Sequence, residues 1–319
     1  MAGLRQRFSN LDIINQVDGF PNASTHPALH AERLSTLTPF THGSYILGYL
    51  LPSVVAALKN AALSGTHWAF TNNTVTLAGT SSSERSAHIA ATLAAWRAAG
   101  TFAVLKCWRN ELYTVYCPPE HEFLHMERSA CALFGVVTYG VHMTVYTVCP
   151  DASIKLWTPR RNPAKETYGG LLDNTVAGGM PEGLTPLETL VKESAEEASL
   201  PEALVRKNAR SVGCVSYFYL RHKSAGGEEG LLQPEVEYCY DMEVDESVVP
   251  APGDDEVQEF NLWGVEKVQE EIALGSFKPN CAMVLIDFFI RRGILNPENE
   301  PDYIEIVSRL HRRFEFPTR

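Results

Sequence analysis

The stretch from Gly178 to Leu200, GGMPEGLTPLETLVKESAEEASL, constrains the fold of this chain more than any other segment. Thr185 is a capping residue, Pro186 occupies the first turn where its missing N–H is harmless, and Glu188 completes a capping box. Pro201 ends the helix, because proline disfavours helical geometry in the residue before it. The sequence therefore predicts a short helix held between a glycine loop and a proline.

This helix is amphipathic. At about 100° per residue, its apolar and small residues gather on one face: Leu187, Leu190, Val191, Ser194 and Ala198. Glu193, Glu196 and Glu197 fall on the other side, where Lys192 precedes Glu196 by one turn and can orient it. Carboxylates one turn apart repel by a few tenths of a kcal/mol per pair on a bare helix. Either water solvates an ordinary acidic face, or a cation sits among the three glutamates.

Hard oxygen ligands in this arrangement suit Mg²⁺ or Mn²⁺, which keep waters and substrate phosphate oxygens as their other ligands. A second source of carboxylates is QPEVEYCY, where Glu235 and Glu237 are spaced to lie on the same side of a strand. For that pair the alternative is surface acidity in an acidic protein.

Strand-like and helix-like segments alternate from residue 126 to 319, which predicts an α/β (α+β) domain with a mixed sheet between helices. Residues 1–125 predict a smaller α+β domain. In it we expect a helix over Arg85–Gly100, two strands around Arg109-Asn110 and a buried helix over Tyr45–Leu58. The segment Pro119–Gly135 is predicted to be helical.

Composition limits the function classes. The formal net charge of −11 argues against a nucleic-acid partner, because phosphate neutralisation needs a basic surface. Seven scattered cysteines without a CxxC pair predict reduced thiols. No apolar run is long enough to span a bilayer and the first residues lack a signal-peptide core, which predicts a cytoplasmic protein without a membrane partner.

The glutamate helix and its glycine loop resemble the Nudix box, G-x5-E-x7-R-E-U-x-E-E-x-G-U, where U is aliphatic. Gly178 matches the first glycine, Lys192 stands for the arginine, and the later matches in register are Glu193, Glu196, Glu197 and Leu200. Leu184 replaces the first glutamate, Ser194 an aliphatic residue and Ser199 the later glycine. A loop shift that used Glu182 would restore one carboxylate.

The wider segment from Trp157 to Pro201 resembles the Nudix proteins related to thiamine pyrophosphokinase, in which an N-terminal domain of unknown function precedes the Nudix domain. Because the chain ends at Arg319, it resembles the stand-alone type without a kinase domain. The resemblance implies a Nudix fold and metal-dependent hydrolysis of thiamine diphosphate, or of its damaged oxy and oxo forms, to the monophosphate and phosphate.

The resemblance also implies roles. Glu193, Glu196 and Glu197 are expected as Mg²⁺ or Mn²⁺ ligands, with Glu193 alternatively the general base, Lys192 as their orienting cation and Glu237 as an added ligand. For a small diphosphate substrate, the expected binding residues are Trp157, Arg160, Arg161, Asn174, Gly178, Gly179 and Glu235. The loop GGEEGLLQPE, with Glu228 and Glu229, is long enough to act as a mobile lid, and the N-terminal part can contribute to the substrate pocket.

Three alternatives stand beside this interpretation. An isopentenyl-diphosphate isomerase shares the fold and the E-x-E-Y strand, but it requires a cysteine and a histidine after Asn174-Thr175, where this chain has Val176-Ala177. A hydrolase of nucleoside diphosphate derivatives such as ADP-ribose or NADH would use the same box. A non-catalytic diphosphate sensor would keep the fold but would not require the surviving glutamates.

Overall fold

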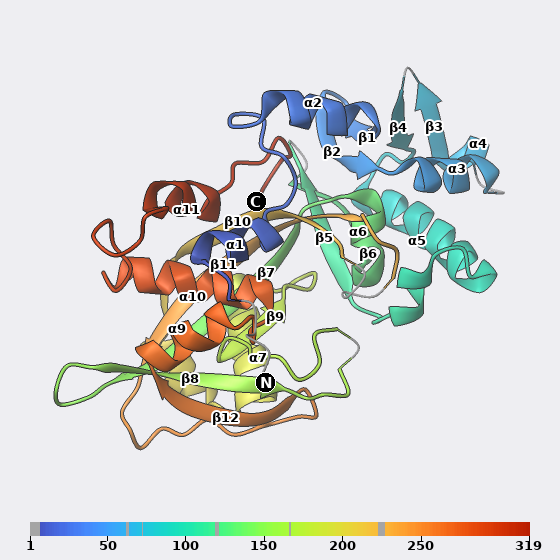
Figure 1. Cartoon of the computed structure of the whole chain (residues 1–319). Coiled ribbons are helices and arrows are strands. Elements are labelled where there is room, and N and C mark those ends of the chain that lie inside the picture. The colour runs from blue at the N-terminus through green and yellow to red at the C-terminus, as the bar shows by residue number, and fades with distance from the viewer. Residues whose placement is uncertain (1–6, 62–63, 72, 119–120, 166, 223–226) are drawn as a thin grey trace, which may run out of the picture.

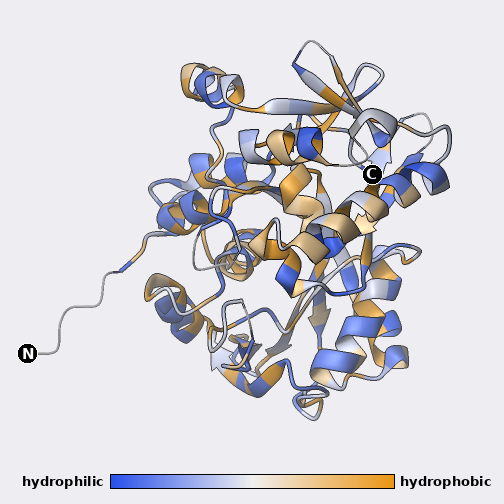
Figure 2. Cartoon of the chain, turned by 90° about the vertical axis from the view of Figure 1, so that its right-hand side faces the viewer, coloured by the Kyte–Doolittle hydropathy of each residue, from blue (hydrophilic) through white to orange (hydrophobic). Residues whose placement is uncertain are grey.

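The structure is a computed structural model that describes residues 7–61, 64–71, 73–118, 121–165, 167–222 and 227–319. Figure 1 shows a first part with a four-stranded sheet at the upper right and a second part built on a larger sheet at the lower left. Figure 2 shows hydrophobic segments gathered toward the centre of the molecule and hydrophilic ones on its outer helices.

The first part combines a four-stranded sheet, in the order β2-β1-β4-β3, with a separate β5-β6 hairpin. Buried aromatic rings, among them Phe40, Trp68, Trp96 and Phe134, form its core. Its elements are α1 (Asn10–Val17), α2 (Pro27–Ser35), β1 (Thr38–His42), β2 (Tyr45–Leu50), α3 (Pro52–Asn60), α4 (Ser64–His67), β3 (Trp68–Thr71), β4 (Thr74–Leu77), α5 (Ser82–Ala99), η1 (Ala103–Cys107), β5 (Leu112–Cys117), β6 (His121–Glu127), η2 (Arg128–Ala130) and α6 (Cys131–Phe134).

The second part is a mixed sheet in the order β10-β11-β7-β8-β12, with β9 paired to β7. Only the β11–β7 pair is parallel among the described strand pairs of this sheet; the others are antiparallel. Its elements are β7 (Thr138–Val148), β8 (Ile154–Arg161), β9 (Val176–Gly179), α7 (Pro186–Ala198), α8 (Glu202–Asn208), β10 (Arg210–Leu220), β11 (Leu232–Glu243), β12 (Val257–Gly264), α9 (Val265–Ala273), α10 (Pro279–Arg291) and α11 (Tyr303–Leu310).

Helices cover both faces of this sheet. On one face, Leu190 and Val191 of α7 pack on Val141 and Val176. On the other face, the helices α1, α9, α10 and α11 form a second apolar cluster with the sheet. The prediction of a mixed sheet between helices, preceded by an α+β region, is therefore confirmed.

Helix α1 comes from the start of the chain but packs on the second part. Its buried residues Ile13, Ile14 and Val17 join the cluster formed by α10 and α11. Directly after it, the buried Asp18 carboxylate accepts hydrogen bonds from Arg312 Nη1 at 2.7 Å and from the Phe218 amide at 3.0 Å. The expected division near residue 125 falls inside β6, and it stays a prediction.

Several expected elements are confirmed and some are wrong. The helix that ends at Gly100 is α5, and strands and helices alternate in the second part as expected. Tyr45–Leu58 is not one helix, because Pro52 begins α3 and the residues before it form β2. Residues 121–127 form β6 by pairing with β5 instead of a helix, and residues 103–107 form a 3-10 helix instead of a strand.

The seven cysteines are free thiols. Within the part of the chain that the structure describes, every helix is too short or too polar to cross a bilayer.

The end of α7 explains one departure from the Nudix box. Ser199 caps the helix in the left-handed conformation, with φ 52° and ψ 30°, and its side chain is exposed. This is the conformation that glycine adopts without a steric penalty, which is why the motif carries glycine at this position.

We expect Ser199→Gly to raise the free energy of unfolding by roughly 0.5–1 kcal/mol. Glycine removes the steric penalty of the left-handed conformation, and the greater backbone entropy of glycine in the unfolded chain offsets part of this gain. Urea unfolding followed by circular dichroism measures the change, with Ser199→Ala as the control that keeps the penalty. A midpoint for Ser199→Gly at or below that of the wild type contradicts this account.

Candidate active site

Helix α7 begins as the capping residues predict. The Thr185 hydroxyl accepts a hydrogen bond from the Glu188 amide at 3.3 Å, and the Glu188 carboxylate accepts one from the Thr185 amide at 2.8 Å. With its apolar face buried on the sheet, the helix has one fixed rotation about its axis. The positions of its glutamates follow from that rotation.

The three glutamates of α7 have different surroundings. Lys192 Nζ donates to Glu193 Oε1 at 3.1 Å and to Glu196 Oε2 at 2.7 Å, so the lysine orients both carboxylates as expected. Glu196 is about half exposed, whereas Glu197 is buried and accepts a hydrogen bond from the Ala177 amide at 2.9 Å. No group of three His, Cys, Asp or Glu side chains in the described ranges is already arranged as a metal site.

Three glycines on two paired strands leave a patch of backbone without side chains, which we call the glycine window: Gly140 of β7 and Gly178 and Gly179 of β9. A Cβ at Gly178 would lie 2.3 Å from Cδ of Glu193, and one at Gly140 would lie 2.2 Å from Oε2 of Glu237. Both distances are far shorter than real contacts, so only glycine lets these carboxylates approach the backbone.

The third glycine admits a residue of the first part. A Cβ at Gly179 would lie 1.5 Å from the hydroxyl oxygen of Tyr113, which belongs to β5. Gly179 pairs with Gly140 in the β7–β9 ladder, so Tyr113 and Glu237 approach neighbouring points of the same patch. Because neighbouring residues of a strand face opposite sides, Tyr113 and Glu237 lie over one face of the window and Glu193 of α7 lies against the other face.

Glu235 and Glu237 lie on the same face of β11, as their spacing predicts. The Tyr217 hydroxyl lies 2.6 Å from Glu235 Oε2 and 2.7 Å from Glu237 Oε1, and it can donate its proton to one of them at a time. Burial, reinforced by repulsion from Glu237, raises the pKa of Glu235. Burial acts the same way on Glu237, but the neighbouring His142 outweighs it and lowers the pKa of that carboxyl.

His142 connects Glu237 to the loop before the window. Its Nε2 lies 3.6 Å from Glu237 Oε2, and its Nδ1 lies 2.6 Å from Asn174 Oδ1. Asn174 is buried and also donates to the Cys281 carbonyl at 3.2 Å. Asn174, expected as a substrate-binding residue, therefore orients His142 and does not line the cavity described next.

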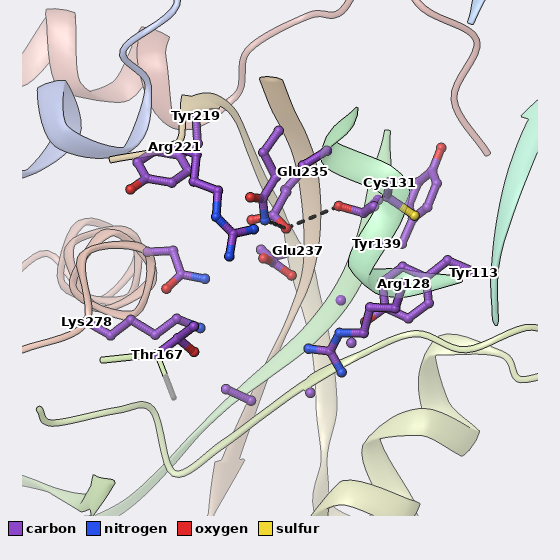
Figure 3. A pocket seen from close by; sticks show the side chains of 18 of the residues that line it. Tyr113, Arg128, Cys131, Tyr139, Thr167, Tyr219, Arg221, Glu235, Glu237 and Lys278 are labelled. Carbon is purple, nitrogen blue, oxygen red and sulfur yellow. Dashed lines mark hydrogen bonds between the residues drawn. The ribbon is translucent and has the colours of Figure 1, made fainter. Parts of the chain in front are cut away.

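A cavity of about 230 Å³ lies between the first part and the sheet, directly over the glycine window. Tyr113, Arg128 and Cys131 line it from one side, while Lys278 and Thr167 approach from the opposite side and Arg221 points in from the end of β10 (Figure 3). Its further lining includes Val104, Cys107, Arg109, Thr138, Tyr139, Gly140, His142, Tyr168, Gly178, Gly179, Tyr217, Tyr219, Glu235, Glu237 and Asn280.

Lys278 stands just before α10 and faces this cavity. Its ammonium makes no hydrogen bond or ion pair with any residue that the structure describes. Burial opposes its charge, but the neighbouring Cys281 and Asp173 side chains outweigh burial and raise the pKa of Lys278 above its ordinary value. A cation without a partner in a polar cavity is a binding group for an anion.

Of the residues expected to bind substrate, Gly178, Gly179 and Glu235 line the cavity, and Trp157, Arg160 and Arg161 do not. Trp157 packs in the core under α7. Arg160 donates to the Gly170 carbonyl at 2.9 Å and pairs with Glu259, while Arg161 pairs with Asp173 at 2.6 Å. Strand β8 pairs with β12 along this stretch, so its side chains meet other partners.

Two expectations concern loops: the mobile lid after β10, and the replacement of the missing box glutamate by Glu182. The loop after β10 is fastened to the first part, because the Glu228 carboxylate accepts hydrogen bonds from the Ala103 and Val104 amides at the start of η1. Gly226 of the expected lid lies outside the described residues. Glu182 does not replace the missing box glutamate here, because its carboxylate lies 3.1 Å from His125 Nδ1 of β6.

Four residues of the cavity wall were not predicted from the sequence as binding residues: Lys278, His142, Tyr113 and Arg128. They come from the loop before α10 and from β7, β5 and η2, and no motif joins them. Only Lys278 has a signal in the sequence: it precedes Pro279, which begins a helix. Because the N-terminus of a helix attracts anions, a lysine beside it indicates an anion-binding position.

The carboxylates of α7 are oxygen donors of the type that a divalent cation binds. Burial, with repulsion from Asp173, raises the pKa of Glu197 well above its ordinary value. Burial also raises the pKa of Glu193. The positive charge of Lys192 lowers this pKa, and repulsion from Glu196 raises it. Crowded carboxylate oxygens that resist ionisation together are the donor set that Mg²⁺ or Mn²⁺ stabilises.

Residues 13–138 match the family model described as a domain of unknown function, DUF4743. The chain is 39% identical over 219 residues to the protein YJR142W of Saccharomyces cerevisiae, covering 67% of this chain and 64% of that protein. It is 40% identical over 209 residues to Nudix hydrolase 20, chloroplastic, of Arabidopsis thaliana, covering 64% of this chain and 53% of that protein. The chain thus spans less than two thirds of the length of either relative.

Among solved structures, the DR0079 protein of Deinococcus radiodurans aligns with 55% of this chain and 97% of its own, at 18% identity and a TM-score of 0.41.

The contact between Tyr113 and Gly179 predicts a coupled pair. We expect Gly179→Ala to lower the free energy of unfolding by about 1–3 kcal/mol, the usual cost of overpacking, because the new methyl group collides with the Tyr113 hydroxyl. In the double variant with Tyr113→Phe, part of that loss is regained, since the nearest colliding atom is gone. Urea unfolding of the four proteins gives the coupling energy. Strict additivity contradicts the contact.

Proposed function

Because residues 13–138 match DUF4743 and the chain is homologous to a plant protein named Nudix hydrolase 20, we propose that this protein is a metal-dependent Nudix pyrophosphohydrolase. The observation that supports this most strongly is the glycine window. Glu193 from α7 and Glu237 from β11 approach its two faces, and Glu237 lines a cavity with cations in its wall.

We assign the metal site to Glu193 and Glu197 of α7 and to Glu237 of β11. Glu196 would complete it, and the Lys192 ammonium, which bridges Glu193 and Glu196, would have to give up its contacts with them. Mg²⁺ or Mn²⁺ bound there would offset the charge of the diphosphate and activate a water for attack on phosphorus. Alternatively, Glu193 is the general base and not a ligand, because burial raises the pKa of its carboxyl.

Other residues of this chain bind the phosphate groups or hold the carboxylates in position. Lys278 offers an unpaired ammonium to a phosphate oxygen, as no described residue pairs with it. Gly178 and Gly179 let Glu193 and Tyr113 approach the backbone closely, as side chains there would not. Tyr217 and His142 hold the Glu235 and Glu237 carboxylates in place on the cavity floor.

For the substrate we propose thiamine diphosphate or its oxy and oxo derivatives, cleaved to the monophosphate and phosphate. The resemblance of Trp157–Pro201 to the thiamine-related Nudix proteins supports this choice. Tyrosine rings in the cavity wall, such as Tyr139, Tyr168 and Tyr219, suit a flat heterocycle. A cavity of about 230 Å³ lies below the usual range of roughly 300–1,000 Å³ for ligand sites, which favours the smaller thiamine compounds over NADH.

The cytoplasmic location stays a prediction; the name of the Arabidopsis relative places that protein in the chloroplast. The expected partner is a small-molecule diphosphate.

The reaction is tested by phosphorus NMR of the products formed with Mg²⁺ or Mn²⁺ from thiamine diphosphate, its oxy derivative, ADP-ribose and NADH. We expect the monophosphate and phosphate from the thiamine compounds. Products only from ADP-ribose or NADH would keep the mechanism and replace the substrate. No product from any of them, with diphosphate still bound, would favour the sensor.

We expect Glu197→Gln and Glu193→Gln each to lower turnover by about 10²–10⁴-fold, because removal of a ligand or base takes away most of the metal or proton-transfer contribution. The far-ultraviolet spectrum should stay unchanged. Glu202→Gln is the matched control, since that glutamate is exposed on α8 and pairs only with Arg206 among the described residues. Equal turnover in the wild type and both α7 variants removes the metal assignment.

We expect Lys278→Met to raise the half-saturating concentration of the diphosphate about tenfold, which corresponds to about 1.4 kcal/mol. The control is Lys267→Met, because that ammonium pairs with Glu270 and Glu271 at the surface. An unchanged half-saturating concentration, with turnover also unchanged, contradicts the role of Lys278 in phosphate binding.

A further inference from the structure

Arg128 is the first residue of η2 in the N-terminal domain, and its side chain reaches the cavity of the second part. Figure 3 shows its guanidinium directed toward the centre of the cavity, beside Tyr113. The Arg128 guanidinium carbon lies 5.3 Å from the centre of the Tyr113 ring, and Nη1 donates to Glu111 Oε2 at 2.9 Å. An aromatic ring and a carboxylate therefore fix the direction of the guanidinium.

Most of the hydrogen-bonding capacity of Arg128 is unused. Its Nε and Nη2 donors have no partner among the residues that the structure describes, and 45% of its side-chain surface is accessible. A guanidinium keeps its charge at any physiological pH and presents a planar fork that fits two phosphate oxygens at once. An oriented fork with free donors in a cavity is suited to an anion.

The glycine window places Arg128 opposite the glutamate helix. A Cβ at Gly179 would lie 3.3 Å from the guanidinium carbon of Arg128, and one at Gly178 would lie 2.3 Å from Glu193. The two glycines are neighbours on β9 and face opposite sides of the strand, so Arg128 lies on the same side as Glu237, and Glu193 lies on the side of α7. A diphosphate in the cavity would meet the Arg128 guanidinium at one wall and the Glu235 and Glu237 carboxylates at another.

Contacts on either side of Arg128 hold the N-terminal domain in this position. Tyr113 rests on Gly179, the Glu182 carboxylate pairs with His125, and Glu228 binds the amides at the start of η1. These contacts join β5, β6 and η1 of the first part to three loops or strands of the second. The position of Arg128 over the window is thus fixed by several independent contacts.

We propose that Arg128 is a substrate-binding residue through which the DUF4743 domain completes the active site by binding the diphosphate in the cavity beside the glycine window. This inference rests on the proposed function for the identity of the anion. It gives the N-terminal domain a chemical role, because that domain supplies the guanidinium that the second part lacks at this wall of the cavity.

The test is calorimetric titration of the full chain with methylenediphosphonate, a diphosphate analogue that is not hydrolysed, in the presence of Mg²⁺. We expect Arg128→Met to weaken binding about ten- to a hundredfold, the usual worth of hydrogen bonds to a charged group. Arg128→Lys should fall between the two, because an ammonium keeps the charge and loses the two-pronged geometry. The matched control is Arg97→Met, since Arg97 also lies over an aromatic ring of this domain, Trp108, but does not line the cavity.

Each result separates this inference from the proposed hydrolysis. Equal binding by the wild type and Arg128→Met overturns the inference, even if thiamine diphosphate is cleaved. Arg128-dependent binding without cleavage of any diphosphate supports the inference and overturns the hydrolysis. If Arg128→Met does not fold, the comparison of Arg128→Lys with the wild type decides, and wild-type affinity in that variant counts against the two-pronged contact. No binding of the analogue by the wild type overturns the inference as well.

Discussion

The backbone at Gly140, Gly178 and Gly179 carries no side chains, and polar groups from three distant segments occupy the space that side chains would need. Glu193 fills it from α7 and Glu237 from β11, while Tyr113 fills it from the N-terminal domain. A larger residue at these positions would displace the Glu193, Glu237 or Tyr113 side chain from the backbone. The cavity, its carboxylates and its cations all depend on the absence of side chains at these three positions.

A chain of polar contacts balances the charges buried below the cavity. Asp173 pairs with Arg161 and accepts a hydrogen bond from the Cys281 thiol at 2.6 Å, and the next residue, Asn174, lies against His142, which faces Glu237. Buried carboxylates are costly unless they are hydrogen-bonded or paired. Arg161, expected to bind substrate, instead neutralises the far end of this chain.

The sequence predicted α7 well because its signals are local: Thr185, Pro186 and Glu188 act within one turn. It predicted the strands of the second part because their apolar runs are long. It failed for β6, whose extended form depends on pairing with β5. The site was only partly predictable for the same reason. A sequence shows that Arg160 and Arg128 are cations, but it does not show their partners. In the structure Arg160 pairs with Glu259, whereas Arg128 has donors that no described residue accepts.

The packing of α1 has a consequence for the order in which this molecule can be completed. Ile13, Ile14 and Val17 are buried against α10 and α11, and Asp18 pairs with Arg312, although nearly the whole chain separates these partners in sequence. A ribosome releases α1 well before α10 and α11, so the apolar face of α1 stays uncovered until those helices emerge. Asp18 and Arg312 stand 294 positions apart in the chain, so this part of the fold closes only after the segment that carries Arg312 has left the ribosome.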